Sequence, residues 1–172
     1  LPPLAEAHHA EQLLDAGEIL FGGIERVHHA RNDRGNDDIF DRIVWRNVTG
    51  SGNETAGHLR LDPRMTLMWC SFDTRPIILR TYGTARTITL GDADWDGLNA
   101  LFPSDVGARQ VFDLAVDLVQ SSCGYAVPLM DNPRERTVLR DWAAQKGPEG
   151  IRAYRAEKNR VTIDGFPTGT GE

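Results

Sequence analysis

Four segments in the middle of the chain have the composition of β-strands, and they constrain the fold more than any other feature. Residues 39–48 (IFDRIVWRNV) are rich in β-branched and aromatic side chains, and residues 64–72 (RMTLMWCSF) are apolar on both faces of a pleat. Residues 75–90 form a longer segment with Gly83 at an expected bend. In residues 109–120 apolar and polar side chains alternate with a period of two, which favours a strand, although part of the segment also fits a helix face. Closure of these strands into a barrel would explain why residues 64–72 are apolar on both faces.

The chain as a whole is expected to form one mainly β domain of the α+β class. Its 172 residues, 40% of them hydrophobic, can bury one sizeable core. Pro133 and Pro148 stand at helix starts and Gly147 stands between them, so two short helices are predicted near the C-terminus. We therefore expect an N-terminal helix within residues 1–17, barrel strands within residues 18–120 (beginning with the strand-like residues 18–27), and C-terminal helices with a tail within residues 121–172.

Charge and hydropathy exclude several classes of partner. The formal net charge of -6 argues against a broad nucleic-acid surface, because neutralising phosphates requires clustered Lys and Arg. No apolar run approaches the roughly 18 residues that a membrane span requires, and residues 1–15 lack the pattern of a signal peptide. We expect a cytoplasmic protein that binds neither nucleic acid nor membrane.

The cysteines and histidines do not suggest a metal site. Cys70 and Cys123 lie far apart with no second pair, so both are expected to be buried thiols rather than ligands. In His8-His9 and His28-His29 the adjacent side chains would point to different sides of a strand, and no carboxylate or cysteine completes a set at helical spacing. The sequence therefore predicts no metal.

The segment VTGSGNETAGHL, residues 48–59, places a glycine-flanked serine at the start of a short predicted helix. The free backbone amides there favour a phosphate, which Ser51, Gly52 and Asn53 could surround. Ser51 and Glu54 also have the spacing of a capping box, in which their side chains take up the same amides. A carboxylate beside a phosphate is repulsive, so we favour the capping box and keep the phosphate site as the alternative. His58, four residues after Glu54, could pair with it.

Several motifs together resemble the pyridoxamine 5'-phosphate oxidase-related family of flavin-binding split β-barrels, specifically its branch with a Gly-Ser-Gly-x-Glu-Thr motif. They are TGSGNETAGHL, RMTLMWCSF, IILRTYG, SCGYAVPLM and KNRVTIDGFP, and they cover about residues 39–167 in a consistent order. The resemblance implies a six-stranded split Greek-key β-barrel with peripheral helices. It also implies a homodimer whose cofactor sites lie between the subunits.

The resemblance further implies which residues bind the cofactor. Arg34, before Gly35, occupies the position of a family lysine that is a plausible phosphate partner, and Arg80 interrupts an apolar strand. Arg42, Arg46 and Arg60 are expected to be structural. The predicted cofactor-binding residues are Arg34, Thr49, Ser51, Gly52, Asn53 and Arg80.

The implied function is an oxidoreductase that uses FMN or a deazaflavin and acts on an unidentified small molecule. No nucleophile motif is present, and none is required, because a flavin carries the chemistry itself. Catalytic side chains therefore stay unassigned. Two alternatives are a haem- or cofactor-binding module without turnover and a degenerate split barrel that serves as a non-catalytic dimer. They are favoured by Glu54-Thr55, which stand where the better-known oxidases of the superfamily carry an Arg-Lys pair.

Overall fold

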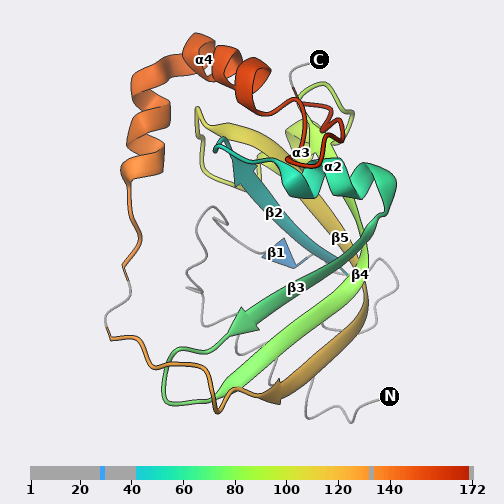
Figure 1. Cartoon of the computed structure of the whole chain (residues 1–172), viewed down its shortest axis with the longest axis vertical. Coiled ribbons are helices and arrows are strands. Elements are labelled where there is room, and N and C mark those ends of the chain that lie inside the picture. The colour runs from blue at the N-terminus through green and yellow to red at the C-terminus, as the bar shows by residue number, and fades with distance from the viewer. Residues whose placement is uncertain (1–27, 30–41, 132–133, 171–172) are drawn as a thin grey trace.

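The computed structural model describes residues 28–29, 42–131 and 134–170. The strands are β1 (His28–His29), β2 (Arg42–Val48), β3 (Arg64–Cys70), β4 (Ile77–Thr89) and β5 (Ala108–Cys123), and the helices are α2 (Glu54–Leu61), α3 (Trp95–Asn99) and α4 (Val138–Lys158) (Figure 1). The α+β class is thus confirmed. Among these described helices, none combines the length and the apolar character needed to cross a bilayer. The predicted N-terminal helix lies outside the described residues.

The strands form one antiparallel sheet in the order β1-β2-β5-β4-β3. The strands predicted within residues 39–48, 64–72, 75–90 and 109–120 correspond to β2, β3, β4 and β5, so the strand assignment of the last segment is confirmed over its helical alternative. The strand predicted within residues 18–27 lies outside the described residues. A six-stranded closed barrel therefore stays a prediction.

Gly83, where a bend was predicted, lies at an irregularity in the pairing of β4 with β5. The register shifts between Tyr82 and Gly83, so one strand carries an extra residue at this point. A Cβ atom at Gly83 would overlap the carbonyl oxygen of Ala115 on the neighbouring strand. Glycine is required here because the two backbones approach too closely for any side chain.

The sheet is buried on both faces near its centre, because β2 and β5 alternate apolar side chains between two clusters. One cluster lies beneath α2 and the other beneath α3. The first comprises Ile43, Trp45, Ala56, Trp69, Leu79, Ala85, Phe112 and Leu114, and the second comprises Val44, Ile88, Trp95, Phe102 and Val111. At about 25 cal/mol per Å² of apolar surface buried, these clusters supply the main driving force for folding.

Strand β3 differs from its predicted environment. It lies at the edge of the described sheet, and only the face that carries Met65, Leu67 and Trp69 packs on the first cluster. Met68, on the other face, is 51% exposed. The prediction that both cysteines are buried is also wrong, because Cys123 is exposed near the end of β5 and Cys70 is only partly buried.

The two C-terminal helices predicted from Gly147 and Pro148 are present as the two halves of α4. Gly147 has φ 65° and ψ 175°, which interrupts the helix, and Pro148 begins the second half. The first half begins at Val138 rather than at Pro133, which lies outside the described residues. The second half lies over the upper end of the sheet in Figure 1, where Arg155 contacts Thr49 and Ala108.

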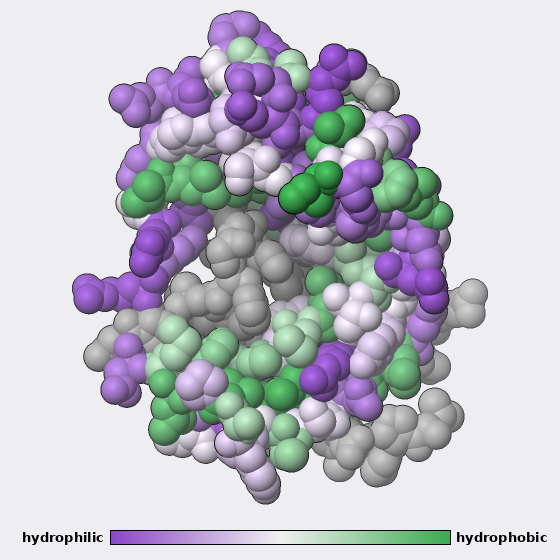
Figure 2. Space-filling view, in the orientation of Figure 1, coloured by the Kyte–Doolittle hydropathy of each residue, from purple (hydrophilic) through white to green (hydrophobic). Residues whose placement is uncertain are grey.

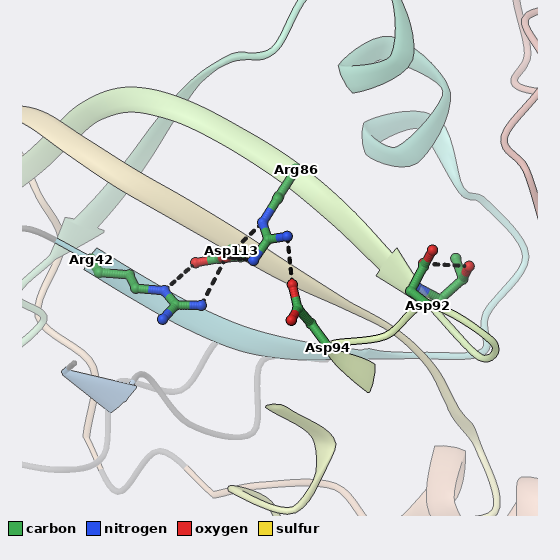
Figure 3. Close-up of polar contacts among 6 residues, drawn as sticks. Arg42, Arg86, Asp92, Asp94 and Asp113 are labelled. Carbon is green, nitrogen blue, oxygen red and sulfur yellow. Dashed lines mark hydrogen bonds and ion pairs between the residues drawn. The ribbon is translucent and has the colours of Figure 1, made fainter. Parts of the chain in front are cut away.

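A network of ion pairs joins β2, β5 and β4 around the buried carboxylate of Asp113 (Figure 3). Arg42 donates from Nε to Asp113 Oδ1 at 2.6 Å and from Nη2 to Oδ2 at 2.9 Å, and Arg86 donates from Nε to Oδ2 at 2.9 Å. Arg86 also reaches Asp94 Oδ2 at 2.7 Å. Burial alone would raise the pKa of Asp113, but the hydrogen bonds from Arg42 and Arg86 lower it below its usual value. The carboxylate therefore stays ionised and holds three strands together.

We predict that Asp113→Asn lowers the free energy of unfolding by about 1–3 kcal/mol near neutral pH, because two arginines lose their buried counter-charge. Arg86 is about half exposed, so water screens its interaction with Asp113, and the loss of stability should be smaller than for a fully buried ion pair. Since the folded pKa of Asp113 is depressed, its stabilisation is present above the unfolded pKa and disappears as pH falls through the folded pKa. Urea unfolding should therefore show that the stabilities of wild type and Asp113→Asn converge below about pH 4.

Asp117→Asn, at an exposed position of the same strand, is the matched control and should change stability by less than about 0.5 kcal/mol. An unchanged Asp113→Asn variant would contradict the prediction.

Candidate functional site

The loop between β2 and α2, residues 49–53, is held by buried polar contacts. Thr49 donates from its backbone N to the carbonyl oxygen of Gly107 at 2.8 Å, and from Oγ1 to the same oxygen at 2.9 Å. Arg155, from the second half of α4, donates to Thr49 Oγ1 at 2.8 Å and to the carbonyl oxygen of Ala108 at 2.7 Å. Thr49 is fully buried, so its hydroxyl is occupied by the fold rather than exposed to a ligand.

Asn53 is the N-cap residue of α2, and its side chain points away from the helix amides. Its Nδ2 donates to Thr170 Oγ1 at 2.8 Å, and its Oδ1 accepts a hydrogen bond from Gln110 Nε2 at 2.6 Å. All three side chains are buried. Asn53 therefore links β5 to the C-terminal segment instead of capping its own helix.

The predicted capping box is wrong. Ser51 is exposed and lies two residues before the N-cap residue of α2, Asn53, which makes no side-chain cap hydrogen bond. Glu54 accepts instead from the backbone N of Ile163, with an N–Oε2 distance of 2.9 Å. The spacing rule fails because the chain enters the helix at Asn53, two residues later than the box requires. Within residues 42–131 and 134–170, no side chain caps the first-turn amides of α2.

Arg109 supplies a buried positive charge beside these amides. It donates from Nε and Nη2 to Asn47 Oδ1 at 2.9 and 2.7 Å, and from Nη1 to the carbonyl oxygen of Gly52 at 2.9 Å. In the described part of the chain it forms no ion pair with a carboxylate. Burial, and secondarily the nearby charge of Arg155, lower the pKa of Arg109 to about 10. A buried cation with only neutral acceptors is an unfavourable arrangement that an anion would relieve.

A cavity of about 230 Å³ lies between Arg109 and the N-terminus of α2. Its lining combines cationic, amide and aromatic groups with one carboxylate. The lining residues are Asn47, Gly52, Asn53, Glu54, Thr55, Arg109, Gln110 and Phe112. The volume and the donors suit a small anion such as a phosphate group, while Glu54 makes one side of the cavity negative.

The structure brings together only part of the predicted site. The loop residues Thr49, Ser51, Gly52 and Asn53 lie next to one another, whereas Arg80 pairs with Gln120 on β5 and donates to Ser122 Oγ at 3.0 Å. Asn53 contacts β5 at Gln110, ten residues from Gln120, which is roughly 30 Å along a strand. Arg80 thus lies far from the loop within one chain. Arg34 lies outside the described residues.

The three arginines expected to be structural make contacts of that kind. Arg42 pairs with Asp113, and the guanidinium of Arg60 lies against Gly169. Arg46 is fully buried, donates to the carbonyl oxygen of Pro103, and lies 5.4 Å from the centre of the Phe102 ring. Arg109 is the residue that sequence reasoning missed. Its position at the start of an alternating segment gives no sign that it is buried.

A second, more open cavity of about 470 Å³ lies at the other end of β5. Its lining includes Arg75, Ile77 and the exposed Cys123 and Tyr125. Ser122, which accepts the hydrogen bond from Arg80, also lines it. These two recesses therefore lie at opposite ends of β5, each near an arginine.

The fold and the first cavity define an antiparallel β-sheet protein with a cationic recess at the N-terminus of a helix. No known family model matches the chain. A pyridoxamine 5'-phosphate oxidase family protein, ustO of Aspergillus flavus, is 42% identical to it over 92 residues, which cover 52% of this chain and 37% of the relative. The match thus spans little more than a third of that relative's length. This similarity to a member of the pyridoxamine 5'-phosphate oxidase family supports the resemblance that the motifs indicated.

We predict that Asn53→Ala lowers the free energy of unfolding by about 1–3 kcal/mol, because it leaves the buried amide of Gln110 and hydroxyl of Thr170 short of a partner. Ser51→Ala, two residues away on the exposed loop, should change it by less than about 0.5 kcal/mol. Denaturant unfolding of both variants checks the pair. A larger effect at Ser51 than at Asn53 would restore the capping box.

Proposed function

We propose that the chain is a flavin-dependent oxidoreductase that uses FMN, or alternatively a deazaflavin, and acts on a small molecule. The observation that carries the proposal is the 42% identity with a pyridoxamine 5'-phosphate oxidase family protein. A bound flavin would supply the electron transfer, and the protein would supply binding, orientation and electrostatics.

The cavity beside Arg109 is the proposed phosphate site. No side chain in the described part of the chain caps the first-turn amides of α2, and the dipole of the helix favours negative charge at this end. Arg109 retains N–H groups beyond those that contact Asn47 and Gly52, since a guanidinium has five. A phosphate here would receive backbone donors and a buried cation together, which offsets the unfavourable burial of Arg109.

Glu54 opposes this site through its charge. Its Oε2 is directed to the backbone N of Ile163, which places part of the carboxylate toward the C-terminal segment, but the residue still lines the cavity. At an effective dielectric constant near 20, a carboxylate close to a phosphate costs about a kcal/mol or more. We therefore expect weaker phosphate binding than an Arg-Lys pair at this position would give.

A homodimer with the cofactor between the subunits would bring Arg80 of one subunit close to the loop before α2 of the other. Arg80 and the second cavity lie too far from Arg109 to contact the same flavin within one chain. In a two-fold dimer the Arg80 end of one subunit can face the Arg109 end of its partner. We propose this arrangement together with completion of the sheet to a six-stranded split barrel by the strand predicted within residues 18–27.

Exposed apolar side chains near the second cavity favour such a dimer. They are Met68, Leu118, Tyr125, Leu129 and Met130, which are 51%, 54%, 83%, 72% and 51% exposed. Figure 2 shows apolar surface gathered on the lower part of the molecule, where β3 and β4 run in Figure 1. Patches of this kind are typical of interaction surfaces.

The first test of the proposed function compares FMN with riboflavin, which has no phosphate. We predict that Arg109→Gln weakens FMN binding about 10- to 150-fold, equivalent to about 1.5–3 kcal/mol for a charge-assisted hydrogen bond, and changes riboflavin binding far less. Arg34→Ala, at the position matching the family's lysine, should discriminate between the two flavins in the same way. Fluorescence titration of the purified protein measures both affinities.

Arg155→Gln is the matched control for this test. It removes a partly buried arginine of the same loop junction that does not line the cavity, so the substitution should lower stability without separating FMN from riboflavin. Equal losses for both flavins in Arg109→Gln would remove the phosphate site. A wild-type protein that binds neither flavin would overturn the oxidoreductase proposal, and a Soret band in its absorption spectrum would favour the haem-binding alternative.

The proposed dimer predicts a particle of about twice the 19.1 kDa chain mass at micromolar concentration. The exposed apolar side chains on β3 and β5 should drive association, so Leu118→Glu should shift the protein toward the monomer. Sedimentation velocity measures both species. Gln145→Glu, at an exposed polar position on α4, tests whether an added charge away from this surface has the same effect. A wild-type protein that sediments only as the monomer would exclude the dimer and favour a single-chain site.

A further inference from the structure

Three side chains with metal-binding atoms meet on the outer surface of α2. Glu54 and His58 lie one helical turn apart, and Asp164 comes from the segment that follows α4. One ligand atom from each side chain lies within 4.8 Å of the others. His58 Nε2 is 3.0 Å from Asp164 Oδ2 and 3.2 Å from Oδ1. Residues 106 positions apart in the sequence thus converge on one point.

Neighbouring groups fix the orientation of both carboxylates. The backbone N of Ile163 donates to Glu54 Oε2 at 2.9 Å, and the hydroxyl of Thr162 donates to Asp164 Oδ1. Groups that orient ligands from outside are a regular feature of metal sites.

The segment that carries Asp164 is itself seated on α2. Gly57 lies against Thr162, where a Cβ atom on the glycine would overlap the threonine methyl group. Gly165, with φ 88°, allows the tight turn in which its backbone N donates to the carbonyl oxygen of Thr162 at 3.0 Å. The turn therefore presents Asp164 to the helix from a defined position.

One imidazole nitrogen and two carboxylates form a donor set suited to a first-row divalent cation. Imidazole disfavours Mg²⁺ and Ca²⁺, which prefer oxygen ligands alone, whereas Zn²⁺ accepts nitrogen and oxygen at about 2.0–2.2 Å. Tetrahedral coordination at that distance separates ligand atoms by about 3.3 Å, so small side-chain rotations suffice. The partial exposure of His58 and Asp164 leaves room for water as a further ligand.

We propose that Glu54, His58 and Asp164 bind a divalent first-row metal ion, with Zn²⁺ as the probe, and that the ion fastens the C-terminal segment to α2. The alternative is a plain surface ion pair between His58 and Asp164, with Glu54 serving only as an acceptor for Ile163. The proposal does not depend on flavin binding, and its test uses protein free of flavin.

Calorimetric titration of the chelator-treated protein with zinc distinguishes the metal site from the plain ion pair. Because His8, His9, His28 and His29 can also bind zinc, the decisive quantity is the difference between wild type and His58→Ala. We expect His58→Ala to bind one Zn²⁺ fewer. We also expect zinc at about 100 times the dissociation constant to raise the melting temperature of wild type by about 5–10 °C more than that of the variant.

Asp164→Asn should show the same loss, whereas Asp62→Asn should not. Asp62 follows the end of α2 and pairs with Arg64 outside the cluster, which makes it a matched control. The visible absorption of bound Co²⁺ gives a second measurement, which reports metal coordination directly and does not depend on the stability of the variants. Equal zinc stoichiometry and equal thermal shifts in wild type, His58→Ala and Asp164→Asn, or wild type without any bound zinc, would overturn the site.

Discussion

Strand β5 is the element on which the rest of the described structure depends. It hydrogen bonds to β2 on one side and to β4 on the other, and its residues from Arg109 to Leu114 are buried. Within these six positions, Phe112 and Leu114 enter one apolar cluster and Val111 enters the other. The same stretch carries Asp113, which anchors the arginine network. Because successive side chains of a strand point to opposite faces of the sheet, this one strand contributes to both apolar clusters, to the ion pairs and to the candidate site.

The beginning of β5 also explains why the C-terminal segment is folded onto the body. Buried arginine and glutamine side chains there need polar partners, since an unsatisfied buried donor costs about 1–3 kcal/mol. The loop before α2 supplies some of these partners, and the C-terminal segment supplies another, because Thr170 Oγ1 donates to Gln110 Oε1 at 3.4 Å. Arg155 of α4 adds hydrogen bonds to Thr49 Oγ1 and to the carbonyl oxygen of Ala108 at the start of β5. Asn159 adds a hydrogen bond from Nδ2 to the carbonyl oxygen of Gly50 at 2.9 Å. Three segments that are distant in sequence thus form one polar junction, and the candidate phosphate cavity lies at its edge.

The strands were predictable because composition and alternation directly reflect which face is buried. Gly83 and Gly147 were predictable for a related reason, since a close backbone approach and a positive φ each exclude other residues. The details of the site were not predictable in this way. The capping box is a local spacing rule, and it failed because the partner of Glu54 is Ile163, which lies 109 positions away. Arg109 was missed because only the folded chain shows that it is buried and faces neutral acceptors.

Glu54 connects the two proposed sites. It lines the phosphate cavity and belongs to the cluster with His58 and Asp164, so its charge acts in both places. A cation bound by that cluster would neutralise the carboxylate and remove its repulsion toward a phosphate at the N-terminus of α2. By linkage, metal and phosphate would then each strengthen the binding of the other by the same factor. With a cation bound in this way, the acidic Glu54 at the N-terminus of α2 would be compatible with an anion site. The charge missing from the helix N-terminus would be supplied by a metal ion held between the helix and the C-terminal segment.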